Sequence, residues 1–158
     1  DCVYLDAGTS TGCMIEYIRE TQATYVTNAL SHAKRLADKG FHVILIGGEL
    51  KSSTDAIVGA EAVVNLQKYH FSKGFFGTNG IEQNGGFTTP DAREAMVKQT
   101  AVKNTQLANR YFLATSSKFG EVYAVTFAGF EGGVILTEAP VQESLPKSVR
   151  VVNVNQPK

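Results

Sequence analysis

The chain has 158 residues, of which 43% are hydrophobic and 19% are charged, enough for one globular domain with a sizeable core. Fifteen Lys and Arg residues balance fifteen Asp and Glu residues, and this neutral charge argues against a strongly basic surface for binding DNA. No apolar run reaches the roughly 18 residues that a membrane span needs.

Short apolar runs alternate with amphipathic segments along the chain. The sequence predicts strands at 2–5, 24–27, 42–46, 73–77, 110–115, 133–137 and 149–154. It predicts helices at 10–19, 30–39, 56–69 and 91–109. Because the strands are apolar on both faces, we expect an α/β fold with a mostly parallel sheet and helices on both sides. No repeat or linker interrupts this pattern, which indicates a single domain over residues 1–158.

Small polar residues follow the predicted strands. In chain order, the segments after the first five strands are DAGTST, Asn28, GGELKSST, TNGIEQNGGFTTPD and SSKFG. The segments at the opposite strand ends, RETQA, DKGF and KYHFS, are plainer. Ligands of open α/β sheets bind beyond the carboxyl ends of the strands, so we expect the binding site at that edge.

The turn from Gly8 to Gly12 joins the first strand to the first helix. The first N–H groups of a helix have no partner within it and favour an anion, so this turn is a candidate phosphate or carboxylate site. Ser and Thr are also the usual N-cap residues, and that alternative stays open. The turn matches neither the Walker pattern nor GxGxxG, so we expect no dinucleotide and no other cofactor.

Two later segments carry charged candidates. Lys118, in SSKFG, would lie at the same edge and could contact an anion, although loop lysines are usually solvated. Asp91, Glu94 and Lys98 share one face of the predicted helix. They could form an N-cap with a Glu–Lys pair, or the carboxylates could bind sugar hydroxyls. Acid–base chemistry is also open to them.

The remaining reactive side chains lack a pattern. His32, His42 and His70 follow no metal-ligand spacing, and we expect structural or surface roles for them and no metal site. Cys2 and Cys13 are too few for a disulfide framework, so we expect buried, reduced thiols in a cytoplasmic protein. The chain starts at Asp1, directly before an apolar strand, which suggests a fragment of a longer protein.

Several motifs in this order and spacing resemble the effector-binding domain of DeoR-type transcriptional regulators. They are YLDAGTST, YVTNAL, VILIGGELKSSTDAIVG, KGFFGTNGI, GGFTTPDAREAMVKQTA and LATSSKFGE, which together span about residues 3–137. The segment TTPDAREAMVKQ is similar in particular to regulators of fructose operons in Gram-positive bacteria. Related members govern lactose and tagatose phosphotransferase systems.

The resemblance implies a fold shared with ribose-5-phosphate isomerase and the CoA transferases. It implies a phosphorylated sugar as effector, with fructose 1-phosphate as first choice and tagatose 6-phosphate as the next. A winged helix-turn-helix domain, absent from this chain, would bind operator DNA, and the protein would be a homo-oligomeric repressor. No membrane partner is implied.

The resemblance also implies a set of effector-binding residues, which come from the matched motifs. They are Asp6, Gly8, Thr9, Ser10, Thr27, Asn28, Gly47, Gly48, Gly80, Gly86, Asp91, Glu94, Lys98 and Lys118. Ser10 replaces the second Thr of the family turn, and Thr115 stands where the family usually has Asp. The missing acid at Thr115 weakens the main alternative, an aldose–ketose isomerase with Glu94 as general base. A module that only assembles and binds no sugar phosphate is a third possibility.

Overall fold

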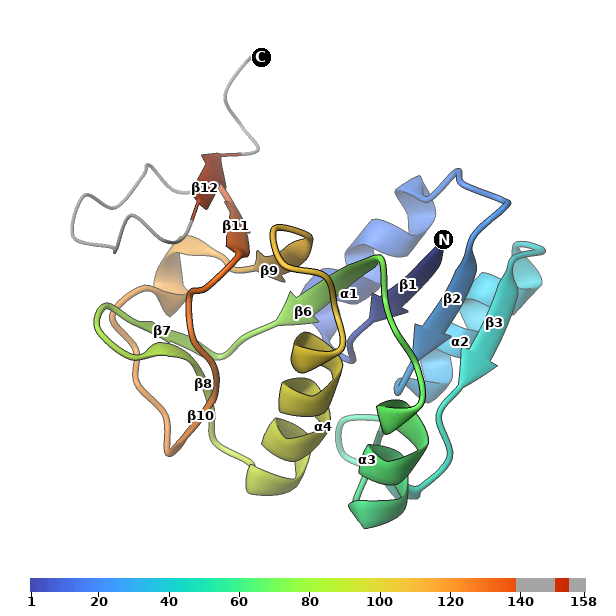
Figure 1. Ribbon diagram of the computed structural model, residues 1–158, viewed down its shortest axis with the longest axis horizontal. Helices are drawn as coiled ribbons and strands as arrows, with labels where there is room; N and C mark the ends of the chain where they lie inside the picture. Colours follow the sequence, from blue (N-terminus) through green and yellow to red (C-terminus); the bar gives the residue numbers. More distant parts are fainter. Residues whose placement is uncertain (139–149, 154–158) are drawn as a thin grey trace.

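A seven-stranded sheet forms the centre of the computed structural model, which describes residues 1–138 and 150–153 (Figure 1). Its strands are β1 (Cys2–Leu5), β2 (Thr24–Thr27), β3 (His42–Leu45), β6 (Lys73–Gly77), β9 (Arg110–Leu113), β11 (Gly133–Thr137) and β12 (Arg150–Asn153). They are ordered β12-β11-β9-β6-β1-β2-β3, and every neighbouring pair is parallel. The expected α/β fold with a mostly parallel sheet is confirmed.

Helices cover both faces of this sheet (Figure 1). On one face lie α1 (Thr9–Met14), its 3₁₀ continuation η1 (Ile15–Tyr17) and α2 (Leu30–Asp38); on the other lie α3 (Ala60–Gln67) and α4 (Ala92–Lys103). Consecutive side chains of a strand point to opposite faces, so one strand serves two cores. Val3 and Leu5 of β1 pack with Leu36 of α2, whereas Tyr4 belongs to the cluster that contains Leu66 of α3.

Two small antiparallel sheets were not predicted from the sequence. One has the order β10-β8-β7, with β7 (Gly80–Glu82), β8 (Gly86–Thr89) and β10 (Val125–Ala128), and it packs against α4. Phe87 of β8 stacks on Phe112 of the main sheet with ring centroids 3.7 Å apart. The other is the hairpin of β4 (Glu49–Lys51) and β5 (Ala56–Val58). Strands of only three or four residues carry little periodic signal.

Several predicted boundaries were wrong. The helix expected from residue 56 begins at Ala60, because residues 56–58 pair with β4 and Gly59 then turns the chain at φ +100°. The helix expected to residue 109 ends at Lys103, and the backbone of Asn104 then bonds to that of Phe71. The first helix stops at Tyr17 rather than residue 19, and its last turn is 3₁₀.

The strand predictions agree in place and are slightly long. Strands expected at 42–46 and 110–115 end at Leu45 and Leu113. For the strand expected at 149–154, the described part is β12, and residues 149 and 154 lie outside the described residues. No helix within residues 1–138 and 150–153 has the length and apolar character needed to cross a membrane.

The strand order creates a switch point beside β1. The chain leaves β1 toward β2 and β3 on one side, and later returns to place β6 on the other side of β1. The connections after β1 and β6 therefore run in opposite directions and leave a crevice at the carboxyl ends of these strands. The segments after β1, β2, β6 and β9, where the sequence placed many of the expected ligand-binding residues, lie at this end of the sheet.

Candidate functional site

A cavity of about 250 Å³ opens at this switch point. Its walls come from the segments after β1, β2, β6 and β9, from α4 and from the β4–β5 hairpin. The lining residues are Asp6, Ala7, Gly8, Thr9, Ser10, Asn28, Thr54, Ala56, Gly77, Thr78, Asn79, Glu94, Lys98 and Lys118. Eight of the fourteen residues singled out from the sequence are among them.

A buried ion pair forms the floor of the cavity. Lys98 Nζ donates to Asp6 Oδ2 and to the carbonyl oxygen of Gly77 at 3.0 Å, and the Gly77 N–H also donates to Asp6 Oδ2. Asp6 is 1% exposed and Lys98 is 8% exposed. Asp6 Oδ1 has no hydrogen-bond partner within the described part of the chain. This oxygen is buried, so a ligand would have to reach the floor of the cavity to donate to it.

The protonation of Asp6 is set by two opposing effects. Burial raises the pKa of the Asp6 carboxyl above its ordinary value, and the charge and hydrogen bond of Lys98 oppose that rise. The net shift of the Asp6 pKa is upward, because the carboxyl group is almost fully removed from water. Lys98 therefore serves to keep this carboxylate ionised in a site that would otherwise favour its neutral form.

The turn after β1 holds two available hydroxyl groups. Thr11 Oγ1 donates to the carbonyl oxygen of Asp6 at 2.6 Å, which ties α1 to the end of β1. Gly8 has φ +133°, a conformation that L side chains rarely adopt. Within residues 1–138 and 150–153, the hydroxyls of Thr9 and Ser10 have no internal partner, and both residues line the cavity. They can donate to an anion.

Asn28 lines the cavity, yet its side chain is occupied by the protein. Its Oδ1 accepts from Tyr4 Oη and from the Ala7 N–H, both at 3.1 Å, and its Nδ2 donates to the Ile57 carbonyl oxygen at 3.1 Å. These bonds connect the turn after β1 to β5. The structure therefore gives Asn28 a positioning role for the cavity wall.

The two carboxylates of the α4 start occupy different environments. Asp91 is the N-cap: its Oδ1 accepts from the N–H groups of Arg93 and Glu94, and Lys51 Nζ donates to its Oδ2 at 2.6 Å. The hydrogen bond from Lys51 lowers the pKa of Asp91. Glu94 lines the cavity instead, where its Oε1 accepts from Thr54 Oγ1 at 2.9 Å and lies 3.6 Å from Lys51 Nζ. Only Glu94 can face a ligand there.

Lys118 is the second lysine of the cavity wall. It ends the short 3₁₀ helix η2 (Ser116–Lys118), is half-buried and lines the cavity. In the described ranges 1–138 and 150–153, no carboxylate forms an ion pair with it. Asp6 pairs with Lys98, whereas Lys51 is shared between Asp91 at 2.6 Å and Glu94 at 3.6 Å. Lys118 is therefore available to pair with an anionic ligand.

Six residues singled out from the sequence do not line the cavity: Thr27, Gly47, Gly48, Gly80, Gly86 and Asp91. Thr27 is fully buried, and its Oγ1 accepts from the Ala29 N–H at 3.1 Å. A Cβ on Gly48 would lie 2.8 Å from Ile57 Cγ2, so this glycine allows the β4–β5 hairpin to fold back.

Gly80 and Gly86 belong to the small antiparallel sheet. A Cβ on either would lie 2.2 Å from a backbone oxygen, that of Glu121 for Gly80 and that of Ala128 for Gly86. Gly86 also has φ +112°. Both glycines are therefore required by the close approach of backbone segments.

Sequence reasoning missed six lining residues: Ala7, Thr54, Ala56, Gly77, Thr78 and Asn79. Thr78 and Asn79 follow β6 directly, and that position alone could have identified them. Thr54 reaches the cavity from the β4–β5 hairpin, whose pairing the sequence did not reveal.

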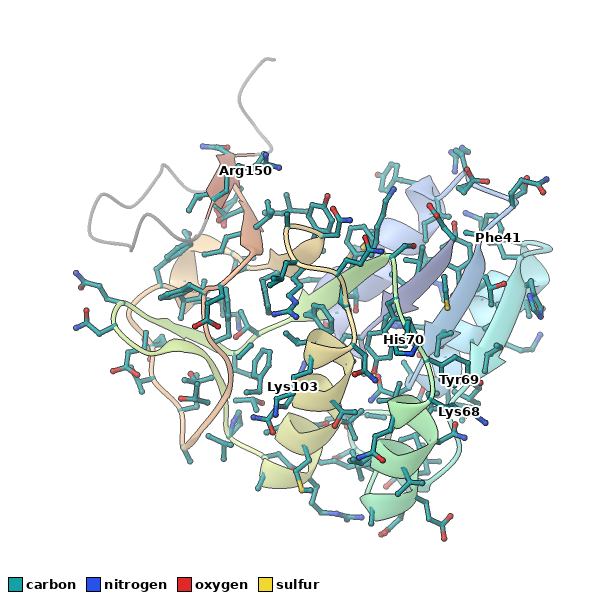
Figure 2. All side chains as sticks on the ribbon, viewed as in Figure 1. Phe41, Lys68, Tyr69, His70, Lys103 and Arg150 are labelled. Carbon is teal, nitrogen blue, oxygen red and sulfur yellow. The ribbon has the colours of Figure 1, made fainter. Side chains whose placement is uncertain are left out.

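The histidines lie apart from one another. His42 is exposed and hydrogen-bonds through Nδ1 to Thr24 Oγ1 at 3.0 Å. Figure 2 labels His70 beside Tyr69, just before β6 and thus at the amino ends of the strands, away from the cavity. His32 is buried in α2. Structural or surface positions were expected for all three.

The cysteine expectation was wrong for Cys13, which is exposed; Cys2 is partly buried, and both thiols are free. Cys13 lies in the short helix α1, whose outer face is open. Within the described residues, no group of three or more His, Cys, Asp and Glu side chains has an arrangement that could hold a metal ion.

The sequence profile of the DeoR C terminal sensor domain matches residues 1–137. The chain belongs to this family. It is 44% identical over 138 residues to an uncharacterized HTH-type transcriptional regulator, FruR, of Bacillus subtilis, covering 87% of this chain and 54% of the relative. The profile thus assigns the chain to the class of sensor domains.

Other relatives are repressors and regulators. A lactose phosphotransferase system repressor of Streptococcus mutans is 34% identical over 124 residues, covering 77% of this chain and 48% of that protein. The HTH-type transcriptional regulator IolR of Bacillus subtilis is 30% identical over 146 residues, covering 90% and 57%. The chain spans about half the length of these curated relatives.

A solved structure shares the fold. Ribose 5-phosphate isomerase A of Methanocaldococcus jannaschii superimposes with a TM-score of 0.50 at 12% identity, covering 75% of this chain and 46% of that one. At this identity the likeness concerns the fold alone. It agrees with the isomerase-like fold that the sequence resemblance implied.

Proposed function

We propose that the cavity binds a phosphorylated sugar and that the chain is the effector-binding domain of a cytoplasmic, homo-oligomeric repressor of a sugar operon. Operator DNA would bind to a winged helix-turn-helix domain outside this chain. The observation that carries the proposal is Lys118, which has no ion-pair partner among the described residues and lines the same small polar cavity as the free hydroxyls of Thr9 and Ser10.

The cavity offers matched groups for the two ends of such a ligand. Lys118, Thr9 and Ser10 would donate to the phosphate oxygens. Asp6 Oδ1 and Glu94 would accept hydrogen bonds from sugar hydroxyls. The volume of about 250 Å³ lies just below the roughly 300–1,000 Å³ of pockets for drug-sized ligands, which suits a small metabolite.

The ligand could act on the rest of the protein through the β4–β5 hairpin. Thr54 of the hairpin tip donates to Glu94, so a sugar hydroxyl that bonds to Glu94 competes with Thr54. A ligand shifts a conformational equilibrium only by its differential affinity for the two states. Contact with this hairpin would supply such a difference, because the hairpin tip contributes Thr54 to the cavity wall.

A thermal-shift panel tests the proposal. The ligands are fructose 1-phosphate, tagatose 6-phosphate, fructose 6-phosphate, ribose 5-phosphate and unphosphorylated fructose. A ligand at about 100 times its Kd stabilises the folded state by about 2.7 kcal/mol, which shifts the Tm by several degrees. We expect a shift with fructose 1-phosphate or tagatose 6-phosphate and none with fructose. No shift with any phosphate would reject the proposal.

An aldose–ketose isomerase is the competing function, since Glu94 is a carboxylate in a cavity of an isomerase-like fold. Its Oε1 is engaged by Thr54 and near Lys51, however, which favours a fixed acceptor over a base that must exchange protons. Turnover of any ligand in the panel, abolished by Glu94→Gln, would establish the enzyme instead.

A further inference from the structure

A second and larger hollow adjoins the cavity. Its volume is about 790 Å³, and α1 with η1, the start of α2 and the tip of the β4–β5 hairpin form its walls. The two hollows share Gly8, Thr9 and Thr54, so they meet on either side of the turn after β1. A hexose phosphate in the first cavity leaves this groove unused.

The groove is furnished with uncharged polar groups. Ser31, Ser52 and Ser53 present exposed residues to it, and Thr54 forms the edge shared with the cavity. Hydroxyls both donate and accept hydrogen bonds. Such a lining suits a ligand that is itself rich in hydroxyl groups.

His32 adds a buried polar group to the same wall. It is 5% exposed, it lines the groove, and its Nδ1 has no hydrogen-bond partner within the described part of the chain. Burial lowers the pKa of His32, so the ring is neutral near pH 7 and can both donate and accept. A Cβ on Gly12 would lie 2.9 Å from His32 Nε2, so a glycine at this point of α1 gives the ring its space.

The charges of the groove argue against a second phosphate. Among the described residues that line it, the one Lys or Arg is Arg35, which lies 3.9 Å from the carboxylate of Glu16. Asp55 adds a second carboxylate, whose Oδ2 accepts from the Ser31 N–H at 2.6 Å. Two acids against one guanidinium leave the groove with a negative balance that would repel an added anion.

An aromatic ring completes the wall. Tyr17 is 77% exposed and is the most exposed large apolar side chain among the described residues. Tyr17 lines the groove together with the polar residues. A flat apolar surface next to hydrogen-bonding groups matches a sugar ring, which has apolar C–H faces and a polar edge.

We propose that this groove is a second subsite, which binds an uncharged glycosyl unit through Tyr17, His32 and the hairpin hydroxyls. The inference rests on the proposed function only in assuming that a sugar phosphate occupies the first cavity, on the other side of Gly8 and Thr9. The glycosyl unit has two possible sources: the second ring of a phosphorylated disaccharide, or a separate free sugar. Both use the same chemistry in the groove.

NMR titration of the ¹⁵N-labelled chain distinguishes these sources. The first probes are the free disaccharides lactose and sucrose. The next pair is galactose 6-phosphate and lactose 6-phosphate, which differ by one glucose unit. The last probe, fructose 1,6-bisphosphate, carries a second phosphate. The free disaccharides are titrated both alone and on the chain saturated with the best phosphate of the thermal panel. We expect shifts at the amides of Cys13, Tyr17 and Ser52, and at least tenfold tighter binding of lactose 6-phosphate than of galactose 6-phosphate if the rings are linked.

Tyr17→Ala tests the groove, and Tyr123→Ala is the matched control, since Tyr123 is also exposed but lies away from both hollows. Tyr17→Ala should reduce, at least fivefold, either the affinity gained from the second sugar ring or the affinity for the free disaccharides. Lys118→Ala should weaken only the phosphorylated probes. Free-disaccharide binding that needs Tyr17 but not Lys118 identifies a separate sugar as the source.

Three results would overturn the inference. In the first, no disaccharide shifts the amides of the groove, and galactose 6-phosphate and lactose 6-phosphate bind with equal affinity. In the second, Tyr17→Ala and Tyr123→Ala have equal effects on binding. In the third, fructose 1,6-bisphosphate binds more tightly than the monophosphates, and Arg35→Ala removes that gain. In each case binding of a sugar phosphate in the first cavity would still support the proposed function. Conversely, Tyr17-dependent sugar binding without any phosphate binding would keep the subsite and reject the proposed function.

Discussion

Asp6 and Lys98 are 92 positions apart in the sequence, yet their side chains form a buried ion pair at the floor of the cavity. Asp6 directly follows β1, and Lys98 comes from the middle of α4. The pair therefore joins the centre of the sheet to the helix that also carries Glu94. It fixes the distance across which a ligand must fit.

Removing one partner of this pair should be costly. Lys98→Met leaves an uncompensated carboxylate in a buried site, and we expect a loss of about 3–5 kcal/mol in the free energy of unfolding near neutral pH. The change would be measured by urea denaturation. Asp6→Asn combined with Lys98→Met should recover part of the loss because no buried charge then remains. A cost no larger than that of the exposed Lys103→Ala would contradict the buried ion pair.

The same variant has a characteristic pH dependence. Without Lys98, burial alone acts on Asp6 and its pKa rises further. A carboxyl whose pKa is raised by folding contributes stability at low pH that is lost as the pH rises through the folded pKa. Lys98→Met should therefore regain stability when the pH is lowered from about 7, relative to the wild type. Parallel pH profiles of the two proteins would refute this account.

Lys118 should matter for binding and little for folding. Lys118→Ala is expected to weaken phosphorylated sugars by roughly 1.5–3 kcal/mol, the scale of a charge-assisted hydrogen bond, and to leave the Tm unchanged. Calorimetric titration of the ligand found in the thermal panel measures this loss. Lys103→Ala is the matched control, since Lys103 ends α4 on the exposed surface outside both hollows. Equal losses in the two variants would remove Lys118 from the site.

Asp91 and Glu94 should separate in their effects. Asp91→Ala removes the N-cap of α4 and should cost about 0.5–2 kcal/mol of stability, with the ranking of sugar ligands preserved. Glu94→Gln keeps the shape of the side chain and removes an anionic acceptor from the cavity, so it should alter that ranking with little loss of stability. Denaturation and competition binding on both variants test the contrast. A changed ranking in Asp91→Ala alone would reverse the assignment.

His32 should contribute to acid sensitivity. Its pKa is lowered mainly by burial; the charge of Asp6 opposes this shift and that of Arg35 adds to it. A His whose pKa is lowered by folding contributes stability above its unfolded pKa of about 6.5, and this is lost as the pH falls through the folded pKa. Between about pH 7.5 and pH 5.5, the Tm of His32→Asn should fall less than that of the wild type. An equal fall would assign the acid sensitivity to other groups.

The sequence alone was enough to predict the class of the fold and the edge of the sheet, at the carboxyl ends of the strands, where polar residues gather. Apolar runs such as residues 2–5 and 24–27 predicted the parallel strands, because a strand buried on both faces cannot alternate with polar residues. Gly8, Thr9, Ser10 and Lys118 were found from their place after strands. These signals are local in the chain.

Only the tertiary structure decided what each polar residue does. The spacing of Asp91 and Glu94 placed both on the same helix face, yet Asp91 caps α4 and Glu94 lines the cavity. The side-chain oxygen of Asn28 accepts hydrogen bonds from Tyr4 and Ala7. Thr54 lies on a hairpin that the hydrophobic pattern of the sequence did not predict. Hydrogen-bond partners far apart in the chain decide these roles, because a polar group is available to a ligand only when no fold partner takes it.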